Sequence, residues 1–146
     1  KTGCPHLETP FHLFWDCPFA KSIWNYYLPM WDSVWNEDMT WSSVLDSSQL
    51  STTSNHKQVK RAAPIAFGIL RAIIIHRIWF NRNAIVFDKP ERSLDKSHLI
   101  FQINHSFRLH WTSCSRIAPN PIVFQLRRLK STLSNLDPKF KTIIGN

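Results

Sequence analysis

The chain has 146 residues, of which 43% are hydrophobic and 13% aromatic, so it is long and apolar enough to fold around a core and is not a disordered chain. Only three glycines argue against a turn-rich all-β fold, and an odd count of three cysteines fits a reducing compartment better than a secreted disulfide framework. The first residue is Lys and not Met, which predicts that the chain is a piece of a longer protein.

The net charge of +8 is unevenly distributed along the chain. Residues 1–55 carry two Lys or Arg and six Asp or Glu, whereas residues 56–107 carry nine and three. Residues 108–146 carry seven basic residues and one acidic residue. A surface that binds a polyanion is therefore expected in the last two thirds of the chain.

Cysteine and histidine cluster at the start of the chain, as Cys4, His12 and Cys17. Thiolate sulfur and imidazole nitrogen are the ligands of structural zinc sites, which are closed by four ligands. The spacing predicts a three-ligand zinc site whose fourth ligand would come from His6 or from residues before Lys1. The alternative is that these side chains are small core residues packed among neighbouring apolar groups.

The next stretch predicts two helical segments. Pro18 fits the first position of a helix that runs to about Leu28, and Pro29 is expected to stop it. Residues 30–46 are expected to be loop with one short helix, capped by Thr40. Residues 50–55 are rich in Ser and Thr, which predicts a mobile connection or a cap for the following helix.

Residues 56–87 predict the longest helix, which Pro64 is expected to kink or divide. Its middle, residues 65–78, is apolar on nearly every side, which predicts a central, buried helix. The aromatic pair Trp79 and Phe80 is expected in the core. The apolar run 64–80 is too short and too charged to predict a membrane span.

A break at Asp88-Lys89-Pro90 separates this helix from another at 94–115, with Ser93 as its expected cap. Its apolar positions are spaced by four and should face the long helix; they are Leu99, Ile103, Phe107 and Trp111. Ala118-Pro119-Asn120-Pro121 predicts a linker before one short helix with the apolar positions Val123, Leu126, Leu129 and Leu133. Lys139 and Lys141 are expected in a frayed tail.

Two stretches resemble a known family. The run Glu8-Thr9-x-x-His12-Leu13-Phe14-x-x-Cys17-Pro18-Phe19-Ala20, followed by Ile23-Trp24, is similar to the zinc-binding domain found after the polymerase in reverse transcriptases of non-LTR (LINE-type) retrotransposons. Ile78-Trp79-x-x-Arg82-Asn83-x-x-x-Phe87 resembles the segment that follows that finger. The resemblance covers residues 4–24 and 76–88. It implies that Cys4, His12 and Cys17 are the second, third and fourth ligands of a Cys-Cys-His-Cys set whose first cysteine is absent here.

The sequence thus predicts a mainly α protein, a small irregular helical bundle with a zinc-finger-like turn at its N-terminus. The expected segments are a zinc-binding-like segment at 1–29, a loop and short helix at 30–55, a helical core at 56–117, and a basic helix and tail at 118–146. The predicted contacts with RNA or DNA are the basic residues Lys57, Lys60, Arg61, Arg127, Arg128 and Lys130.

The acidic residues are scattered, and neither a paired-aspartate polymerase motif nor a Gly-rich phosphate loop is present, so no enzyme activity is predicted. A Cys17–His12 nucleophile pair is the weaker alternative. The resemblance implies an upstream reverse transcriptase polymerase domain as partner, and an intracellular location, nuclear or cytoplasmic with access to the nucleus. Neither a membrane nor a small-molecule substrate is expected. Two other interpretations are a scaffold that packs on the polymerase and a degenerate relic of a mobile element.

Overall fold

The structure is a computed structural model that describes residue 4 and residues 8–87 and 89–145. Across these residues the chain is mostly helical and has no strand, so the predicted mainly α bundle with an N-terminal Cys/His turn is confirmed. In chain order the elements are η1 (His12–Asp16), α1 (Pro18–Trp35), α2 (Trp41–Leu45), η2 (Ser47–Gln49), η3 (Ser54–Val59), α3 (Ala62–Val86), η4 (Pro90–Arg92), α4 (Lys96–Ile117), α5 (Asn120–Leu136) and α6 (Lys139–Ile144).

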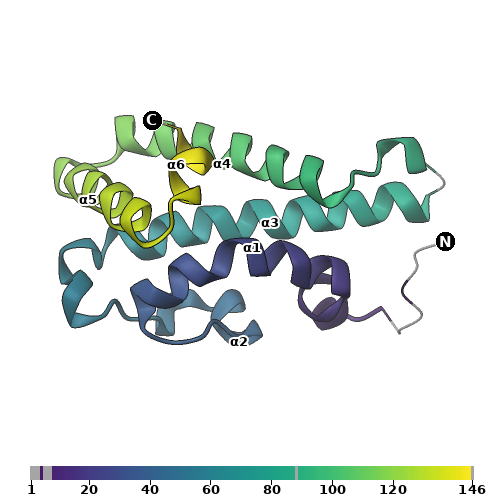
Figure 1. Ribbon diagram of the computed structural model, residues 1–146, viewed down its shortest axis with the longest axis horizontal. Coiled ribbons are helices and arrows are strands. Elements are labelled where there is room, and N and C mark those ends of the chain that lie inside the picture. The colour runs from purple at the N-terminus through teal and green to yellow at the C-terminus, as the bar shows by residue number, and fades with distance from the viewer. Residues whose placement is uncertain (1–3, 5–7, 88, 146) are drawn as a thin grey trace.

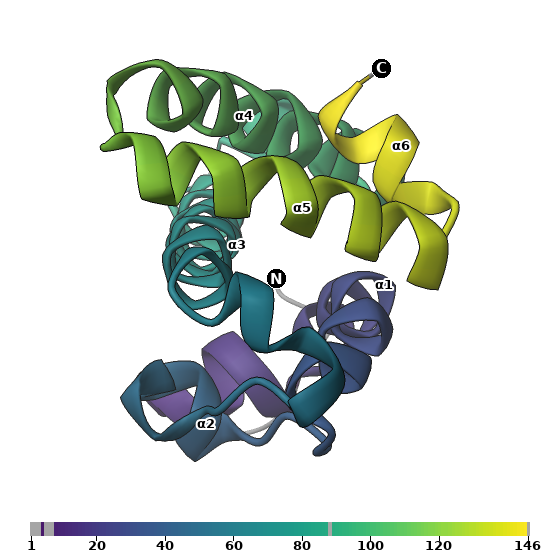
Figure 2. The ribbon, with the colours of Figure 1, turned by 90° about the vertical axis from the view of Figure 1, so that its left-hand side faces the viewer.

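The long helix α3 runs through the middle of the molecule (Figure 1). α1 runs antiparallel to α3 on one side, and α4 returns antiparallel on the other side. α5 and α6 lie at the end where α3 begins, and Figure 2 shows α5 crossing that end between α4 and α1. A single core joins buried residues from Ala20 to Ile144; its largest fully buried side chains are Trp24, Tyr27, Trp31, Phe67, Phe107 and Phe140.

α1 continues seven residues past its predicted end, with Pro29 inside it. The expected stop is wrong because the residues beyond the proline lie on the buried side of the helix, and burial of large side chains outweighs one missing hydrogen bond. Met30, Trp31 and Val34 are all at most 2% exposed. The helix ends at Asn36, whose φ of 56° is a left-handed conformation that asparagine tolerates better than most residues.

α2 follows the prediction, because the side chain of Thr40 accepts a hydrogen bond from the backbone N–H of Ser43 and so caps the helix. The long helix does not begin at residue 56. Residues 54–59 form the separate 3-10 segment η3, and α3 begins at Ala62. Pro64 therefore lies in the first turn, where its missing N–H removes no helical hydrogen bond.

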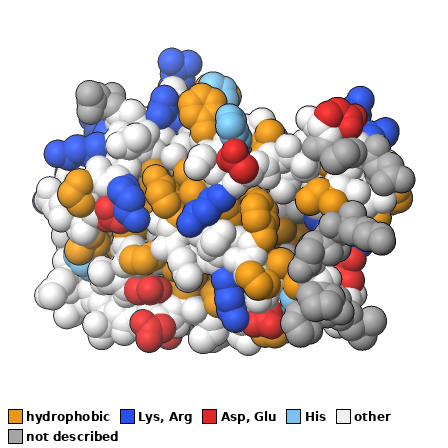
Figure 3. Space-filling model, turned by 45° about the vertical axis from the view of Figure 1, so that its right-hand side comes forward, with side chains coloured by type: hydrophobic (Ala, Val, Ile, Leu, Met, Phe, Trp, Pro, Cys, Tyr) orange, Lys and Arg blue, Asp and Glu red, His pale blue; other side chains and the backbone are white. Residues whose placement is uncertain are grey.

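α3 is buried along one face and not on every side. Ala66, Phe67, Leu70 and Ile74 are fully buried, whereas Ile65 is 39% exposed. The prediction that Trp79 and Phe80 lie in the core is wrong, since they are 48% and 50% exposed. Their neighbours Ile78 and Asn81 take the buried face at this end of the helix. Figure 3 shows apolar side chains at the surface between separated basic and acidic groups.

The 25 residues of α3 are long and apolar enough to cross a membrane by length and composition alone. The sequence analysis expected the apolar run 64–80 to be too short for a membrane span. The helix is longer than that run because it extends beyond both of its ends. Core helices of soluble proteins pass the same test, and 33% of the most apolar window of α3 is buried against the rest of this chain.

α3 ends at Val86, just before the predicted break, and α4 follows after η4. The cap of α4 is Asp95 and not Ser93, because the carboxylate of Asp95 accepts from the backbone N–H of His98. The apolar stripe of α4 is buried as predicted and packs along α3; its members are Leu99, Ile103, Phe107 and Trp111.

The C-terminal region is better ordered than the sequence indicates. α5 buries Leu126, Leu129 and Leu133 as predicted, whereas Val123 is only half-buried and the neighbouring Ile122 is buried. The expected frayed tail is wrong, because residues 139–144 form the helix α6, whose Phe140 and Ile143 are fully buried. Their apolar side chains are spaced by three residues, which places both on one face of a helix, where burial stabilises it.

Candidate functional site

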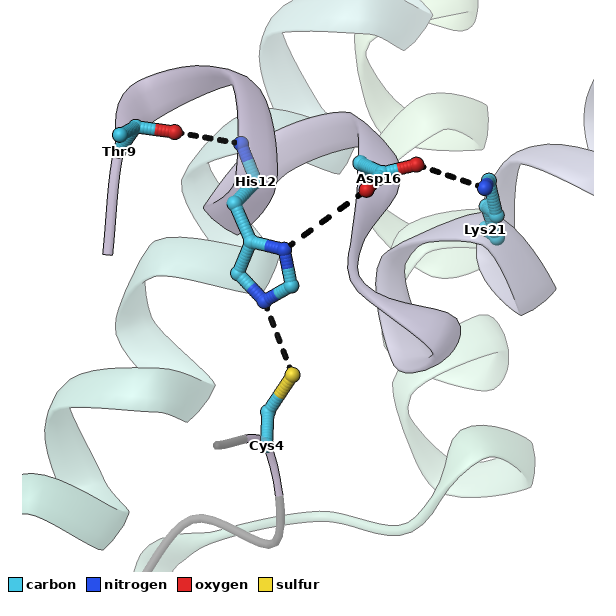
Figure 4. Close-up of polar contacts among 5 residues, drawn as sticks. All are labelled: Cys4, Thr9, His12, Asp16 and Lys21. Carbon is cyan, nitrogen blue, oxygen red and sulfur yellow. Dashed lines mark hydrogen bonds and ion pairs between the residues drawn. The ribbon is translucent and has the colours of Figure 1, made fainter. Parts of the chain in front are cut away.

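The side chains of Cys4, His12 and Cys17 converge at the N-terminal edge of the bundle. Their sulfur and nitrogen atoms all lie within 4.8 Å of one another, so the three residues could hold a metal ion. Cys4 Sγ and His12 Nε2 are 2.9 Å apart, and Figure 4 shows the thiol and the imidazole ring pointing toward each other. The sequence prediction of these three residues as one site therefore matches their placement.

A π-helical turn brings His12 and Cys17 to the same side. The backbone N–H of Cys17 donates to the carbonyl of His12 at 2.8 Å, five residues back, which is the spacing of a π turn. Thr9 caps the start of this turn, because its hydroxyl accepts from the backbone N–H of His12 at 3.1 Å. Cys17 lies at the N-cap of α1, where the partial positive charge of the helix favours an anionic ligand.

The η1 turn is fixed against α1 by an indole. Trp24 Nε1 donates to the carbonyl oxygen of Phe14 at 2.6 Å. Trp24 itself is 2% exposed, so the first helix of the bundle holds the backbone of the turn between the two ligands. The turn is thus positioned by the core of the protein and not only by its own hydrogen bonds.

Asp16 lies on the other side of the His12 ring from Cys4 (Figure 4). Its Oδ2 is 3.9 Å from His12 Nδ1, and its Oδ1 accepts from Lys21 Nζ at 2.7 Å. A carboxylate behind a ligating histidine orients the ring and makes it a better ligand. The sequence analysis missed Asp16 as a neighbour of His12, although the four-residue spacing places the two on one side of a helical turn.

The two thiols and the imidazole are ligand types that a tetrahedral zinc ion takes, and their separations are close to those of zinc ligands. Zinc–sulfur and zinc–nitrogen bonds of about 2.3 and 2.0 Å place tetrahedral ligand atoms about 3.5–3.8 Å apart. The Cys4–His12 separation of 2.9 Å is that of a hydrogen-bonded pair and would widen by less than about 1 Å around an ion. His6, one of the two predicted sources of a fourth ligand, lies outside the described residues.

The group of Cys4, His12 and Cys17, here called the Cys/His cluster, borders a cavity of about 360 Å³ between α1 and the end of α3. Its lining includes Cys4, Cys17, Ile78 and Arg82. Arg82 pairs with Glu8, so the two stretches that carry the family resemblance meet in space. These stretches are more than fifty residues apart in the chain, and their contact is a finding that sequence spacing alone does not predict.

Five of the six predicted nucleic-acid contacts lie on neighbouring elements at the other end of the molecule. η3 packs against α5, and Gln125 Oε1 on α5 accepts from the backbone N–H groups of Arg61 and Ala62 at 2.9 and 3.2 Å. The exposed side chains of this surface, here called the basic surface, are Lys57, Lys60, Arg61, Arg127 and Arg128.

Lys130 is placed differently from the other five. It is half-buried and lies on the flank of α5 that faces α6, where it shares a shallow hollow with Lys141. The sequence grouped it with Arg127 and Arg128 by proximity along the chain. Arg128 and Lys130 are two residues apart, which corresponds to about 200° of rotation around a helix, so these two side chains point to different flanks of α5.

Phe124 is a member of the basic surface that the sequence analysis missed. Its ring is 60% exposed, and the guanidinium carbon of Arg128 lies 5.5 Å from the ring centroid. The spacing of four residues between Phe124 and Arg128 could have indicated this pair.

Comparisons with protein-family models, curated proteins and solved structures found no match to this chain.

Proposed function

We propose that this chain is a zinc-organised helical module that binds nucleic acid and has no catalytic activity of its own. The observation that carries the proposal is the convergence of Cys4, His12 and Cys17, a donor set that suits zinc. The ion would hold the N-terminal turn against α1 and the end of α3. In this interpretation the metal has a structural role and the basic surface has the binding role.

Two observations support nucleic acid as the ligand class. The basic surface is exposed, and none of the ion pairs among the described residues includes one of its cations. Unpaired Lys and Arg can neutralise phosphates and release counterions, which gives affinity for RNA and DNA. The resemblance to the region after the polymerase of non-LTR retrotransposons favours the same class and adds a reverse transcriptase domain as partner, in a compartment with access to the nucleus.

The metal assignment predicts that single ligand substitutions lower zinc affinity strongly. Cys4→Ser and Cys17→Ser each remove one thiolate, and we expect the dissociation constant for zinc to rise by more than about 100-fold, since ligand loss exceeds the 10- to 100-fold effect of removing an outer partner. Competition with a chromogenic chelator measures the constant directly.

Cys114→Ser provides the matched control, because Cys114 is a free, half-buried thiol on α4 away from the N-terminal turn. It should bind zinc like the parent. Equal zinc affinity for the parent and Cys17→Ser would show that the three residues are packed side chains and not a metal site.

A second candidate function is a scaffold that packs on a protein partner and binds no nucleic acid. The exposed apolar side chains favour it, with Leu45 at 56%, Trp79 at 48% and Phe80 at 50% exposure. Salt separates the two functions. Retention on immobilised RNA that falls steeply between about 50 and 200 mM salt supports phosphate binding, and no retention at either concentration supports the scaffold.

A further inference from the structure

A shallow hollow of about 420 Å³ opens on the outer side of α5, next to η3. Its lining combines two cations, Arg127 and Arg128, with the ring of Phe124 and the amides of Gln58 and Asn135. These groups come from segments more than sixty residues apart in the chain. The hollow therefore exists only in the folded protein, and its lining is chemically mixed.

Phe124 gives the hollow an accessible aromatic surface. The ring remains 60% exposed although the guanidinium of Arg128 lies over it at 5.5 Å. A guanidinium held over a ring is itself a flat cationic surface on which a base can stack. An exposed aromatic side chain beside unpaired arginines is typical of proteins that bind single strands.

The hollow continues along α5 into a second one. Ser131 and Asn135 line both, and the second hollow adds Lys130 and Lys141. The outer side of α5 thus carries cations on both flanks, with small hydroxyl and amide side chains between them. A flexible phosphate backbone can follow such a track, with its phosphates near the cations.

We propose that this surface binds unpaired nucleotides of a single strand, with a base stacked at Phe124 and phosphates held by Arg127 and Arg128. The inference rests on the proposed nucleic-acid binding and narrows it to single strands. In a duplex the bases are stacked on each other, so the ring of Phe124 would have no base to contact. An acidic peptide would pair with the cations and leave the ring unused.

The experiment compares the affinity of the zinc-supplemented chain for three probes of equal length: single-stranded RNA, single-stranded DNA and a blunt DNA duplex. Fluorescence anisotropy over a series of salt concentrations gives both the dissociation constant and its salt slope. We expect binding to either single strand to be at least about fivefold tighter than to the duplex, since one stacked base contributes about a 5- to 100-fold gain in affinity. The single strand that binds more tightly, RNA or DNA, identifies the kind of nucleic acid that the surface prefers.

Phe124→Leu should weaken single-strand binding by about 5- to 100-fold and leave the salt slope unchanged, because it removes stacking and no charge. Phe101→Leu is the matched control, since Phe101 is a 70% exposed phenylalanine on α4 outside both hollows. It should bind like the parent. Near-parental thermal unfolding of both variants is expected from their exposure.

The double substitution Arg127→Glu and Arg128→Glu should weaken binding and reduce the salt slope by about 1.4, or about 0.7 per lost phosphate contact on a single strand. Lys89→Glu with Arg92→Glu changes the net charge equally at exposed positions in the connection between α3 and α4 and should have a much smaller effect. This control distinguishes the effect of the two arginines on α5 from the effect of a lower net charge.

Four results would overturn the inference. Duplex binding as tight as single-strand binding, or no effect of Phe124→Leu, would contradict the preference for single strands. Either result would still be compatible with the proposed nucleic-acid binding. Displacement of the strand by an acidic peptide of equal length and equal charge at the same concentration would assign the surface to a protein ligand. Absence of binding to all three probes would remove the proposed function itself.

Discussion

Asn81 shows how one residue can fix the connection between two helices. Its side chain is a polar amide, yet it is buried, at 5% exposure. Its Oδ1 accepts from the backbone N–H of Leu94 at 2.5 Å, and its Nδ2 donates to the carbonyl of Leu94 at 3.2 Å. The amide thus satisfies both backbone groups of Leu94, as a neighbouring β-strand would. These two hydrogen bonds fix the segment just before α4 against the end of α3.

Asn81→Ala should lower the free energy of unfolding by about 1–3 kcal/mol, because it leaves both backbone groups of Leu94 without their partner in a partly buried place. Urea unfolding followed by circular dichroism measures the change. Asn25→Ala, at an exposed position of α1, is the control and should change stability by less than about 0.5 kcal/mol. A loss of similar size in both variants would show that the pairing with Leu94 contributes little.

Asp95 adds a pH-dependent contribution to stability. The hydrogen bond from the backbone N–H of His98, followed by that from the His98 ring, lowers the pKa of Asp95. A carboxyl whose pKa is lower in the folded state contributes stability that is fully present above its unfolded pKa of about 3.9. That contribution is lost as the pH falls through the lower folded pKa.

Asp95→Asn keeps an oxygen that can cap α4 but cannot titrate. The difference in free energy of unfolding between parent and variant should therefore shrink as the pH is lowered from about 5 to 2. Urea unfolding at a series of pH values measures it. A difference that stays constant across this range would mean that the cap does not depend on the charge of Asp95.

At the scale of the element, α1 tolerates a proline in its interior. Pro29 is exposed and has no N–H to donate to the carbonyl four residues earlier, yet the helix continues to Trp35. Replacing it restores a helical hydrogen bond without loss of buried surface. Pro29→Ala should raise the free energy of unfolding by about 1–3 kcal/mol, as measured by urea unfolding.

Pro121→Ala is the matched control for this prediction, because Pro121 is exposed and lies in the first turn of α5, where no helical hydrogen bond is missing. Its effect should be less than about 1 kcal/mol. Equal effects of the two substitutions would point to the flexibility of the unfolded chain as their shared cause.

The elements that the sequence predicted well are those whose own pattern determines them. The four-residue spacing of α4 and the cap at Thr40 are local signals, and both are present in the structure. The wrong end of α1 and the helix α6, which was expected to be a frayed tail, have a different cause. Trp31 and Phe140 are fully buried by elements distant in the chain, and such packing has no local signal.

The candidate site divides in the same way. Residue type and spacing were enough to select Cys4, His12 and Cys17, because ligand chemistry is local. The pairing of Glu8 with Arg82 and the meeting of η3 with α5 depend on the path of the chain, so sequence spacing could not predict them.

At the scale of the whole molecule, the acidic and the basic segments of the chain form different elements of the fold. The mostly acidic first third includes η1, α1 and α2, whereas η3 and α5 place two basic segments side by side. The segments that hold residues 56–61 and 127–130 are neighbours in the structure, whereas Lys130 lies on the flank of α5 that faces α6.

The length of α3 separates the Cys/His cluster from the basic surface. Arg82 at its far end borders the cavity beside Cys17, while Ala62 at its first turn is capped from α5. A helix of 25 residues is about 37 Å long. Because the two ends share no side chain, the free-energy effects of substitutions at one end should add to those at the other end. Under the proposed function, Cys17→Ser should therefore lower zinc affinity and leave strand binding unchanged, and Arg127→Glu should lower strand binding and leave zinc affinity unchanged.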